Sequence, residues 1–294
     1  MKKIILIINL MLIATIGFSQ NTIDAEDILR KIDSGEIISY KNMTINGDLD
    51  LTSLKNNIEK KGDGWFDIDD EKIIITIEQK IEFENCNFRG SVTGYLNKED
   101  DDILYITKFK NPVTFNNCTF NKEVTFKYTT FYGLVNFQSS TFDDYVEFKY
   151  TNFESNSDFT KSKFNDDANF KYTNFEEKTS FNGVIFKKEA IFKYTNFDDD
   201  VRFIGSNFQN IAIFKYTNFD GRINFENSNF DGLAEFKYTN FSSGVSFKNA
   251  TMQDVDFKYT NFSQPLVFEG LTINGSIDHK YANGANGIFD KRSW

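Results

Sequence analysis

The sequence of 294 residues contains one histidine, His279, and only two cysteines, Cys86 and Cys118. With so few of these side chains the chain has no zinc-binding motif, and no histidine lies near either thiol in the sequence to activate it. Phosphate-binding loops, dinucleotide-binding glycine motifs and serine nucleophile elbows are also absent. We therefore expect no enzymatic activity, and the sequence predicts no cofactor and no metal site.

The chain also lacks an excess of positive charge. It has 33 basic and 43 acidic residues, and its formal net charge is −10. Nonspecific binding to nucleic acids requires clustered lysine and arginine opposite the phosphate backbone, so we expect no nucleic-acid partner. Such a charge favours solubility and partners that are neutral or basic.

Only one long apolar run is present, and it lies at the amino terminus. Lys2 and Lys3 precede an apolar stretch over residues 4–18, and Ser19 and Gln20 follow where a small-residue cleavage site would fall. This arrangement is typical of a secretory signal peptide over residues 1–20. A membrane anchor is the alternative, but the run is shorter than the ~20 residues that a spanning helix needs. We expect an exported protein, periplasmic or secreted, with no transmembrane segment after cleavage.

What the chain has in excess is phenylalanine, with 34 copies. From Phe109 to Ile273 large apolar residues recur at spacings that alternate between six and five, and Phe83 and Phe88 begin the series before an interruption. The one irregular step joins Met252 to Phe257, where one residue is missing. Neither a helical period of 3.6 nor a strand period of two fits this spacing. A chain that turns a corner once per unit does.

A small or β-branched residue stands two positions before nearly every phenylalanine, as in Thr151-Asn152-Phe153 and Thr173-Asn174-Phe175. Over residues 81–275 this pattern resembles that of the pentapeptide-repeat family, with a sixth residue added to every second unit. The resemblance implies an all-β fold, a right-handed quadrilateral β-helix with four units per coil. The extra residue implies a larger corner on two of the four edges.

The motif Phe-Lys-Tyr-Thr-Asn-Phe returns every 22 residues, and once after 21, which is the length of one coil. Its lysines and tyrosines should therefore form two adjacent outward rows, with rungs ~4.8 Å apart. The candidate interaction rows contain Lys149, Tyr150, Lys171, Tyr172, Lys193, Tyr194, Lys215, Tyr216, Lys237 and Tyr238.

Two interpretations of these rows remain open. Stacked tyrosines can serve a purely structural purpose by covering the edges of the coils. Alternatively, the rows form a flat aromatic and cationic platform for a periodic partner, such as an envelope polysaccharide or an acidic protein surface. Aspartates that follow the inward phenylalanines, as at Asp143 and Asp166, are expected to cap turns. Calcium binding or a pair of glycosidase carboxylates is the less favoured reading of these acids.

Cys86 and Cys118 both occupy the small inward position, 32 residues apart, which is one coil of 22 plus an insertion of ten. We expect them to stack on adjacent coils. They are interpreted first as small buried apolar residues. A disulfide is the alternative, since an exported protein permits oxidation.

The remaining segments are expected to close the two ends of the solenoid. The pattern over residues 22–35 predicts a helix, capped by Thr22 or Asp24 and ended by Gly35. Residues 55–71 read as a loop, and the isoleucines over 73–77 as a strand. The domains are thus a signal peptide at 1–20, a cap region at 21–80, the repeats at 81–275 with an acidic insertion at about 95–103, and a carboxyl-terminal cap at 276–294 that includes Tyr281 and Trp294.

On function, the sequence favours a non-enzymatic structural or binding scaffold of the bacterial cell envelope, whose partner is an unknown protein or polysaccharide. The alternative is an envelope carbohydrate-binding or carbohydrate-processing protein that uses the Lys and Tyr rows or the corner acids. The resemblance adds a third idea, since some pentapeptide-repeat proteins mimic duplex DNA and bind gyrase. The signal peptide disfavours that idea, because gyrase is cytoplasmic.

Overall fold

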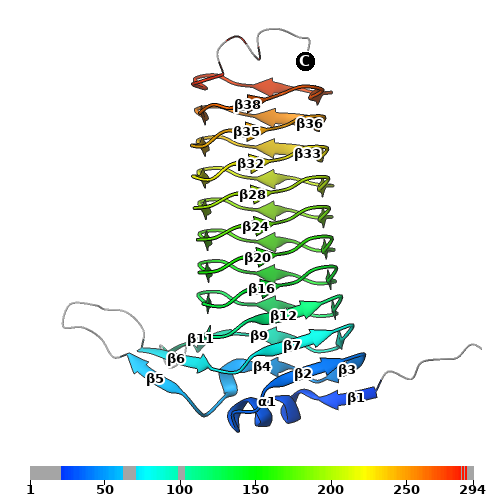
Figure 1. The fold of residues 1–294 in the computed structure, drawn as a ribbon, viewed down its shortest axis with the longest axis vertical. Coiled ribbons are helices and arrows are strands. Elements are labelled where there is room, and N and C mark those ends of the chain that lie inside the picture. Colours follow the sequence, from blue (N-terminus) through cyan, green and yellow to red (C-terminus); the bar gives the residue numbers. More distant parts are fainter. Residues whose placement is uncertain (1–20, 62–70, 99–102, 286, 288, 290–294) are drawn as a thin grey trace, which may run out of the picture.

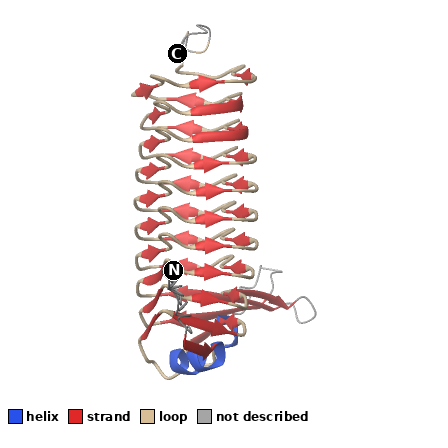
Figure 2. Ribbon diagram, turned by 90° about the vertical axis from the view of Figure 1, so that its right-hand side faces the viewer, coloured by secondary structure: helices blue, strands red, loops and turns tan. Residues whose placement is uncertain are grey.

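The computed structural model describes residues 21–61, 71–98, 103–285, 287 and 289. The chain winds into a stack of coils that stands on a wider base, where the helix lies (Figures 1 and 2). The predicted signal peptide and Trp294 lie outside the described residues. Each coil has four sides, which we number faces 1 to 4 in chain order. Within a face every strand pairs in parallel with the equivalent strand of the next coil, so the expected quadrilateral β-helix is confirmed.

The four faces are built mostly from strands of two residues. Face 1 consists of β2 (Ile38–Lys41), β7 (Ile81–Glu84), β12 (Val113–Asn116), β16 (Val135–Asn136), β20 (Ser157–Asp158), β24 (Thr179–Ser180), β28 (Val201–Arg202), β32 (Ile223–Asn224), β35 (Val245–Ser246) and β38 (Leu266–Val267). Face 2 consists of β1 (Asn21–Asp24), β3 (Met43–Asn46), β8 (Asn87–Phe88), β13 (Thr119–Phe120), β17 (Thr141–Phe142), β21 (Lys163–Phe164), β25 (Ile185–Phe186), β29 (Asn207–Phe208) and β39 (Thr272–Ile273). Face 3 consists of β4 (Leu49–Asp50), β9 (Val92–Thr93), β14 (Val124–Thr125), β18 (Val146–Glu147), β22 (Ala168–Asn169), β26 (Ala190–Ile191), β30 (Ala212–Ile213) and β40 (Ile277–Asp278). Face 4 consists of β6 (Glu71–Ile77), β11 (Ile103–Phe109), β15 (Thr130–Phe131), β19 (Asn152–Phe153), β23 (Asn174–Phe175), β27 (Asn196–Phe197), β31 (Asn218–Phe219), β34 (Asn240–Phe241) and β37 (Asn261–Phe262).

Two longer strands near the carboxyl end, β33 (Asn229–Glu235) and β36 (Thr251–Asp256), run from face 2 into face 3. Their mutual register shifts between Phe230 and Leu233. The shift compensates for the residue that is missing between Met252 and Phe257. The shorter coil therefore still pairs with its neighbours on both sides of the shift.

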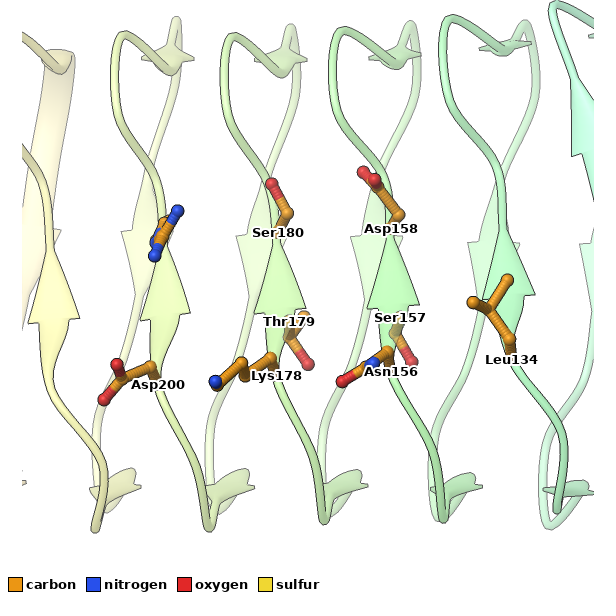
Figure 3. A pocket seen from close by; sticks show the side chains of 9 residues that line it. Leu134, Asn156, Ser157, Asp158, Lys178, Thr179, Ser180 and Asp200 are labelled. Carbon is orange, nitrogen blue, oxygen red and sulfur yellow. The ribbon is translucent and has the colours of Figure 1, made fainter.

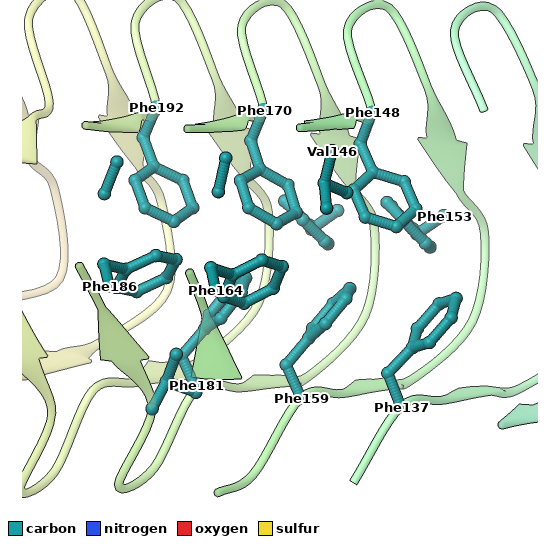
Figure 4. Close-up of a cluster of buried hydrophobic side chains, with 14 of the residues drawn as sticks. Phe137, Val146, Phe148, Phe153, Phe159, Phe164, Phe170, Phe181, Phe186 and Phe192 are labelled. Atoms are coloured by element: carbon teal, nitrogen blue, oxygen red, sulfur yellow. The ribbon is translucent and has the colours of Figure 1, made fainter. Parts of the chain in front are cut away.

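The core is made of phenylalanine columns that run along the axis of the solenoid (Figure 4). Phe159, for example, stacks on Phe137 and Phe181 in the coils on either side, with ring centroids 5.4 and 4.8 Å away, and it meets Phe148 and Phe170 edge-on. The regular spacing of the sequence thus places every ring against the same kind of neighbour. Offset and edge-on contacts of this kind each contribute about 0.5–1.5 kcal/mol beyond the burial of area.

The inward threonines bond along the stack, but not mainly to each other. The hydroxyl of Thr173 donates to the carbonyl of Phe148 in the preceding coil at 2.6 Å, and the equivalent threonines of the other coils repeat this bond: Thr151, Thr195, Thr217, Thr239 and Thr260. A direct hydroxyl–hydroxyl contact joins Thr107 and Thr129 at 3.2 Å. Each of these threonine hydroxyls therefore ties two coils together.

The corners of a coil alternate between tight and wide, as the five–six spacing predicts. Corners 1/2 and 3/4 are tight turns closed by a backbone bond such as that from Thr151 N to Phe148 O. Corners 2/3 and 4/1 contain the sixth residue of the longer units. The expected enlargement of two edges is confirmed.

At the amino-terminal end, the predicted helix over residues 22–35 is wrong in its first turn. Residues 21–24 form β1, and the helix α1 spans Ala25–Asp33. Ile23 pairs with Ile45 of β3, so tertiary strand pairing overrides the helical pattern there. Asp24 precedes the helix without a side-chain cap bond, and Gly35 ends the turn at a φ of 84°. The buried side of α1 covers the first coil.

Coil-like pairing begins inside the segment that the sequence assigned to the cap, because β2, β3 and β4 already pair with the first coil. A short 3₁₀ helix, η1 (Leu51–Ser53), follows. Within the predicted loop over residues 55–71 lies β5 (Ile58–Lys61), which pairs antiparallel with β6. In the predicted insertion, β10 (Tyr95–Lys98) pairs antiparallel with β11. These four strands extend face 4 sideways at the base (Figure 1).

At the carboxyl end the ring of Phe289 covers the last phenylalanines. Its centroid lies 5.2 Å from that of Phe257 and 5.5 Å from that of Phe268. Within the described residues no helix is long and apolar enough to cross a membrane.

Candidate binding surface

The predicted lysine and tyrosine rows lie together at corner 3/4, which we call the Lys–Tyr corner. In each coil the turn places lysine second and tyrosine third, and the tyrosine takes a left-handed backbone conformation, with a φ of 60° at Tyr172. Residues other than glycine and asparagine rarely adopt this backbone conformation. Something specific to tyrosine must therefore offset the backbone cost in coil after coil.

The other tight corner shows what the backbone alone prefers. At corner 1/2 the same left-handed position is mostly taken by asparagine or glycine, as at Asn117, Gly183, Gly205 and Asn249, and in two coils by Ser139 and Lys161. Asparagine and glycine are the residues that tolerate this conformation best. The tyrosines at the Lys–Tyr corner are thus present for their side chains.

These tyrosine rings stack face to face along the whole solenoid. From Tyr128 to Tyr259 consecutive centroids are 4.7–4.8 Å apart and the planes differ by at most 6°. Tyr281 extends the row at 4.8 Å with a tilt of 23°, and Tyr95 of β10 meets Tyr128 at 5.7 Å at the other end. Neighbouring rings cover each other's faces, so the row offers its edges and hydroxyl groups outward. Tyr281, which is 56% exposed, has the most accessible ring.

The lysines lie beside these rings. The Nζ atoms of Lys149, Lys171 and Lys193 are 5.1, 4.9 and 5.1 Å from the ring centroid of the tyrosine that follows each of them. This is the range of a cation–π contact. Burial lowers the pKa of Lys171, and the like charges of Lys149 and Lys193 lower it further. The lysine row therefore carries mutual repulsion that the fold does not remove.

Some lysines of the row have partners. Lys127 donates to the hydroxyl of Tyr95 at 3.3 Å, Lys215 pairs with Glu235 at 3.6 Å, and Lys258 pairs with Asp278 at 2.7 Å. Within the described part of the chain, Lys149, Lys171 and Lys193 make no ion pair. These three consecutive lysines form a local positive stripe on an acidic protein.

Next to the Lys–Tyr corner, in the middle of face 4, lies a row of asparagines. Their amides form a chain in which each Nδ2 donates to the Oδ1 of the coil before it, at 2.7–3.1 Å. The chain runs through Asn174, Asn196, Asn218, Asn240, Asn261 and Asn283. Because each amide uses one N–H within the chain, the row keeps hydrogen-bonding capacity toward solvent.

The far edge of face 4 carries an acidic row made of Glu154, Glu176, Asp198 and Asp220. Asn152 donates to Glu154 and Glu176, at 3.3 and 3.1 Å. Burial raises the pKa of Asp198, and the like charges of Asp220 and Glu176 add to that rise. No ion pair compensates these four carboxylates within the described residues. Face 4 thus carries a positive stripe at one edge, amides in the middle and a negative stripe at the other edge.

The structure places all ten predicted interaction residues on one straight corner, where the sequence had put them. It adds the ends of the tyrosine row, Tyr95 and Tyr281, and the flanking asparagine and acidic rows. Tyr281 could have been found, since Lys280-Tyr281 follows Tyr259 by 22 residues. The acids after the inward phenylalanines had been read first as turn-capping residues, with calcium binding or glycosidase carboxylates as the less favoured alternatives.

Cys86 and Cys118 are buried at equivalent positions of adjacent coils, and both are free thiols. Each Sγ donates to carbonyl groups, as from Cys86 to Glu84 and from Cys118 to Asn116, at 3.4 and 3.5 Å. A hydrogen bond from Cys118 lowers the pKa of Cys86 to about 7, and the pKa of Cys118 is raised in return. The structure agrees with the interpretation as buried apolar residues, while the disulfide stays a prediction.

Two of the shallow hollows in the described part of the chain lie on other surfaces. One of about 330 Å³ runs over face 1, where Asp158, Lys178 and Arg202 are among the lining residues (Figure 3). The other, of about 310 Å³, lies at the start of α1. In the first, the hydroxyls of Ser157 and Thr179 donate to the carbonyl groups of Ser155 and Glu177. Within the described residues no three His, Cys, Asp or Glu side chains are placed to hold a metal ion.

A stack of four-sided coils with closed ends and an uninterrupted core defines a repeat scaffold protein. The family model described as pentapeptide repeats (9 copies) matches residues 107–152, 148–195, 192–240 and 225–272, which together cover more than half of the chain. The chain therefore belongs to the pentapeptide-repeat family. A search of the curated proteins finds no match.

Proposed function

We propose that this protein is a non-enzymatic binding scaffold of the bacterial cell envelope, with face 4 and the Lys–Tyr corner as its binding surface. The observation that carries the proposal is the set of uncompensated charges at Lys149, Lys171 and Lys193. Each coil carries one of these lysines, and each lysine lies beside a tyrosine whose backbone takes an unfavourable left-handed conformation. Such rows expose regularly spaced groups on a rigid support, and rigidity lowers the ordering cost of binding.

The place of action rests on the sequence. The signal-peptide pattern over residues 1–20 favours export. The mass of the mature protein after expression in a bacterial host tests this step. Processing near Gln20 and recovery outside the cytoplasm are expected, and a cytoplasmic protein that retains residues 1–20 would contradict it.

The binding step is tested by capture from the envelope fraction with two baits. One bait is the natural chain, and the other carries Lys149→Glu, Lys171→Glu and Lys193→Glu. A component that the first bait retains and the second loses supports the proposal. Equal capture by both baits, or capture by neither, contradicts it. Equal urea midpoints of the two baits show that the substitutions leave the fold intact.

Carbohydrate binding is the second candidate, and the exposed ring of Tyr281 favours it at one position. A sugar can pack on an open aromatic face, which stacked inner rings such as Tyr172 and Tyr194 do not present. On a glycan panel, Tyr281→Ala should abolish binding while the protein stays folded, with a smaller loss of stability than a substitution of Tyr172 causes. If binding instead depends on Tyr172 and Tyr194, the sugar contacts the row from its edge. If no glycan binds, the candidate is removed.

A further inference from the structure

Face 4 carries two charged stripes of opposite sign that run parallel to the solenoid axis. In four consecutive coils the lysine of the corner and the carboxylate of the far edge are five residues apart: Lys149 and Glu154, Lys171 and Glu176, Lys193 and Asp198, and Lys215 and Asp220. The asparagine row lies between them. A surface with this left–right asymmetry can be complementary to its own copy.

We propose that face 4 binds face 4 of a second copy of this chain, in a parallel dimer whose two-fold axis runs along the solenoid between the two asparagine rows. This inference rests on the proposed function of face 4 as a binding surface and names its partner. A rotation about that axis exchanges the two edges of the face and leaves the height of each coil unchanged. The lysine stripe of one copy then lies opposite the acidic stripe of the other.

The pairing is specific, because it joins residues of the same coil. Lys149 meets Glu154 of the second copy, Lys171 meets Glu176, and Lys193 meets Asp198. Within the described residues these three lysines make no ion pair in their own chain, and each has a carboxylate five residues further on. The next lysine of the row, Lys215, already pairs internally with Glu235. The alternative two-fold axis, perpendicular to the stripes, would place lysine against lysine and carboxylate against carboxylate.

The repulsion within each stripe gives the physical reason for association. Burial is the main cause of the lowered pKa of Lys171 and of the raised pKa of Asp198, and the like charges one rung away add to both shifts. Opposite charges supplied by a second copy relieve both stripes at once. The asparagine rows, whose amides keep free N–H groups, meet at the centre. A closed two-fold contact of this kind is the commonest form of homo-oligomer.

Charge-swap complementation tests the proposal. The first variant carries Lys149→Glu, Lys171→Glu and Lys193→Glu, and the second carries Glu154→Lys, Glu176→Lys and Asp198→Lys. Each variant has two stripes of one sign, so each alone should sediment as a monomer. An equimolar mixture should form a heterodimer, because one copy is then positive at both edges and the other negative. Rows of like charge occur in the natural chain with both signs, so both variants should fold.

The matched control places the same charge change on other faces, with Lys163→Glu, Lys187→Glu and Lys188→Glu. It should dimerise as the natural chain does. Dimerisation of the natural chain should also weaken in about 1 M salt, where the Debye length is about 3 Å. A natural chain that stays monomeric at low salt, variants that dimerise alone, or a mixture that stays monomeric would each overturn the proposal.

Cysteine cross-linking tests the direction of the two copies. In the parallel dimer Asn174→Cys and Asn240→Cys both lie next to their own equivalents, so both should form cross-linked dimers under mild oxidation. In an antiparallel dimer at most one of the two levels can meet itself. The natural cysteines are buried, so the unmodified chain gives the background.

The experiments separate this inference from the proposed function. If the natural bait captures an envelope component but sediments as a monomer, face 4 is a binding surface and the dimer is wrong. If the protein dimerises as described but captures nothing, the dimer stands and the wider scaffold function loses its support.

Discussion

Tyr172 offers the sharpest test of why tyrosine occupies the left-handed position of the Lys–Tyr corner. Its ring stacks on Tyr150 at 4.7 Å and on Tyr194 at 4.8 Å, and the Nζ of Lys171 lies 4.9 Å from its centroid. We consider Tyr172→Asn, because asparagine is among the residues that take the left-handed position at corner 1/2. The substitution improves the backbone fit while removing every contact of the ring.

The expected magnitude follows from these contacts. Two stacked pairs contribute about 0.5–1.5 kcal/mol each, and an exposed cation–π contact adds about 0.5–1 kcal/mol. Relief of the left-handed conformation returns about 1 kcal/mol, taken from the lower end of the cost for ordinary side chains. The net loss of unfolding free energy should be about 0.5–3 kcal/mol by these values.

Urea unfolding followed by far-UV circular dichroism, in about 1 M salt to screen any charge-mediated association, measures this loss. Tyr281→Asn removes one stacked neighbour instead of two, so its effect should be about half as large. Gly205→Asn changes the same backbone position at corner 1/2, where no heavy atom lies within 4 Å of the added Cβ, and should be nearly neutral. If Tyr172→Asn leaves stability unchanged or raises it, stacking does not explain the tyrosine row.

Three further predictions concern the core and one ion pair. Thr173→Val removes the 2.6 Å bond to the preceding coil and should cost about 0.5–1.5 kcal/mol in chemical denaturation, whereas Ser162→Ala, whose buried hydroxyl has no partner, should be neutral or stabilising. Equal losses for both would refute a role for the threonine bond. Phe159→Ala opens a cavity in a stacked column and should cost about 3–5 kcal/mol by the same measurement; a loss below about 1 kcal/mol would show that the column collapses around it. The bond with Lys258 lowers the pKa of Asp278 and raises that of Lys258, so this pair stabilises the fold at neutral pH and its contribution disappears as the pH falls through the lowered carboxyl pKa or rises through the raised ammonium pKa. Asp278→Asn removes the ion pair, so the urea midpoint of the variant should change less with pH than that of the natural chain at both the acidic and the basic limit. A pH profile equal to that of the natural chain would contradict the assignment.

Most of the fold could be predicted because one rule is repeated in many coils. The spacing of the phenylalanines reports which residues face inward, and the 22-residue return of the Lys–Tyr motif reports which residues share a corner. Both signals depend only on side-chain size and on the length of the repeat, so substitutions within single units do not obscure them. The core, the four faces and the straight lysine and tyrosine rows followed from them.

The two ends of the solenoid were harder to predict from the sequence, because the repeat is imperfect there. Ile23 fits a helical stripe with Ile28, yet it lies in β1, where β3 offers a partner that no local pattern reveals. Lys280-Tyr281 continues the corner, but His279 replaces the phenylalanine before it and Ala282 the threonine after it. A search for the whole motif therefore misses it.

The character of the candidate surface could be predicted only in part. The sequence places the tyrosines in a row, but the coil rise and the turn geometry decide that their ring faces are covered. The acids after the inward phenylalanines resemble turn residues individually. Their meaning as a stripe, with Glu154 at the same height as Lys149, emerges only when coils are superposed.

The in-register coil of 22 residues has a consequence for how this molecule can change in length. Because each coil meets its neighbours with the same rings, turns and backbone bonds, removing one whole coil, for example residues 148–169, brings together surfaces that already match. The product would be one rung shorter, by ~4.8 Å, with the same cross-section and the same end closures. The length of this solenoid can therefore change only in steps of one coil, and it is set by the number of copies of a single sequence unit. Because the length does not depend on what makes the unit fold, such a chain can serve as a molecular ruler.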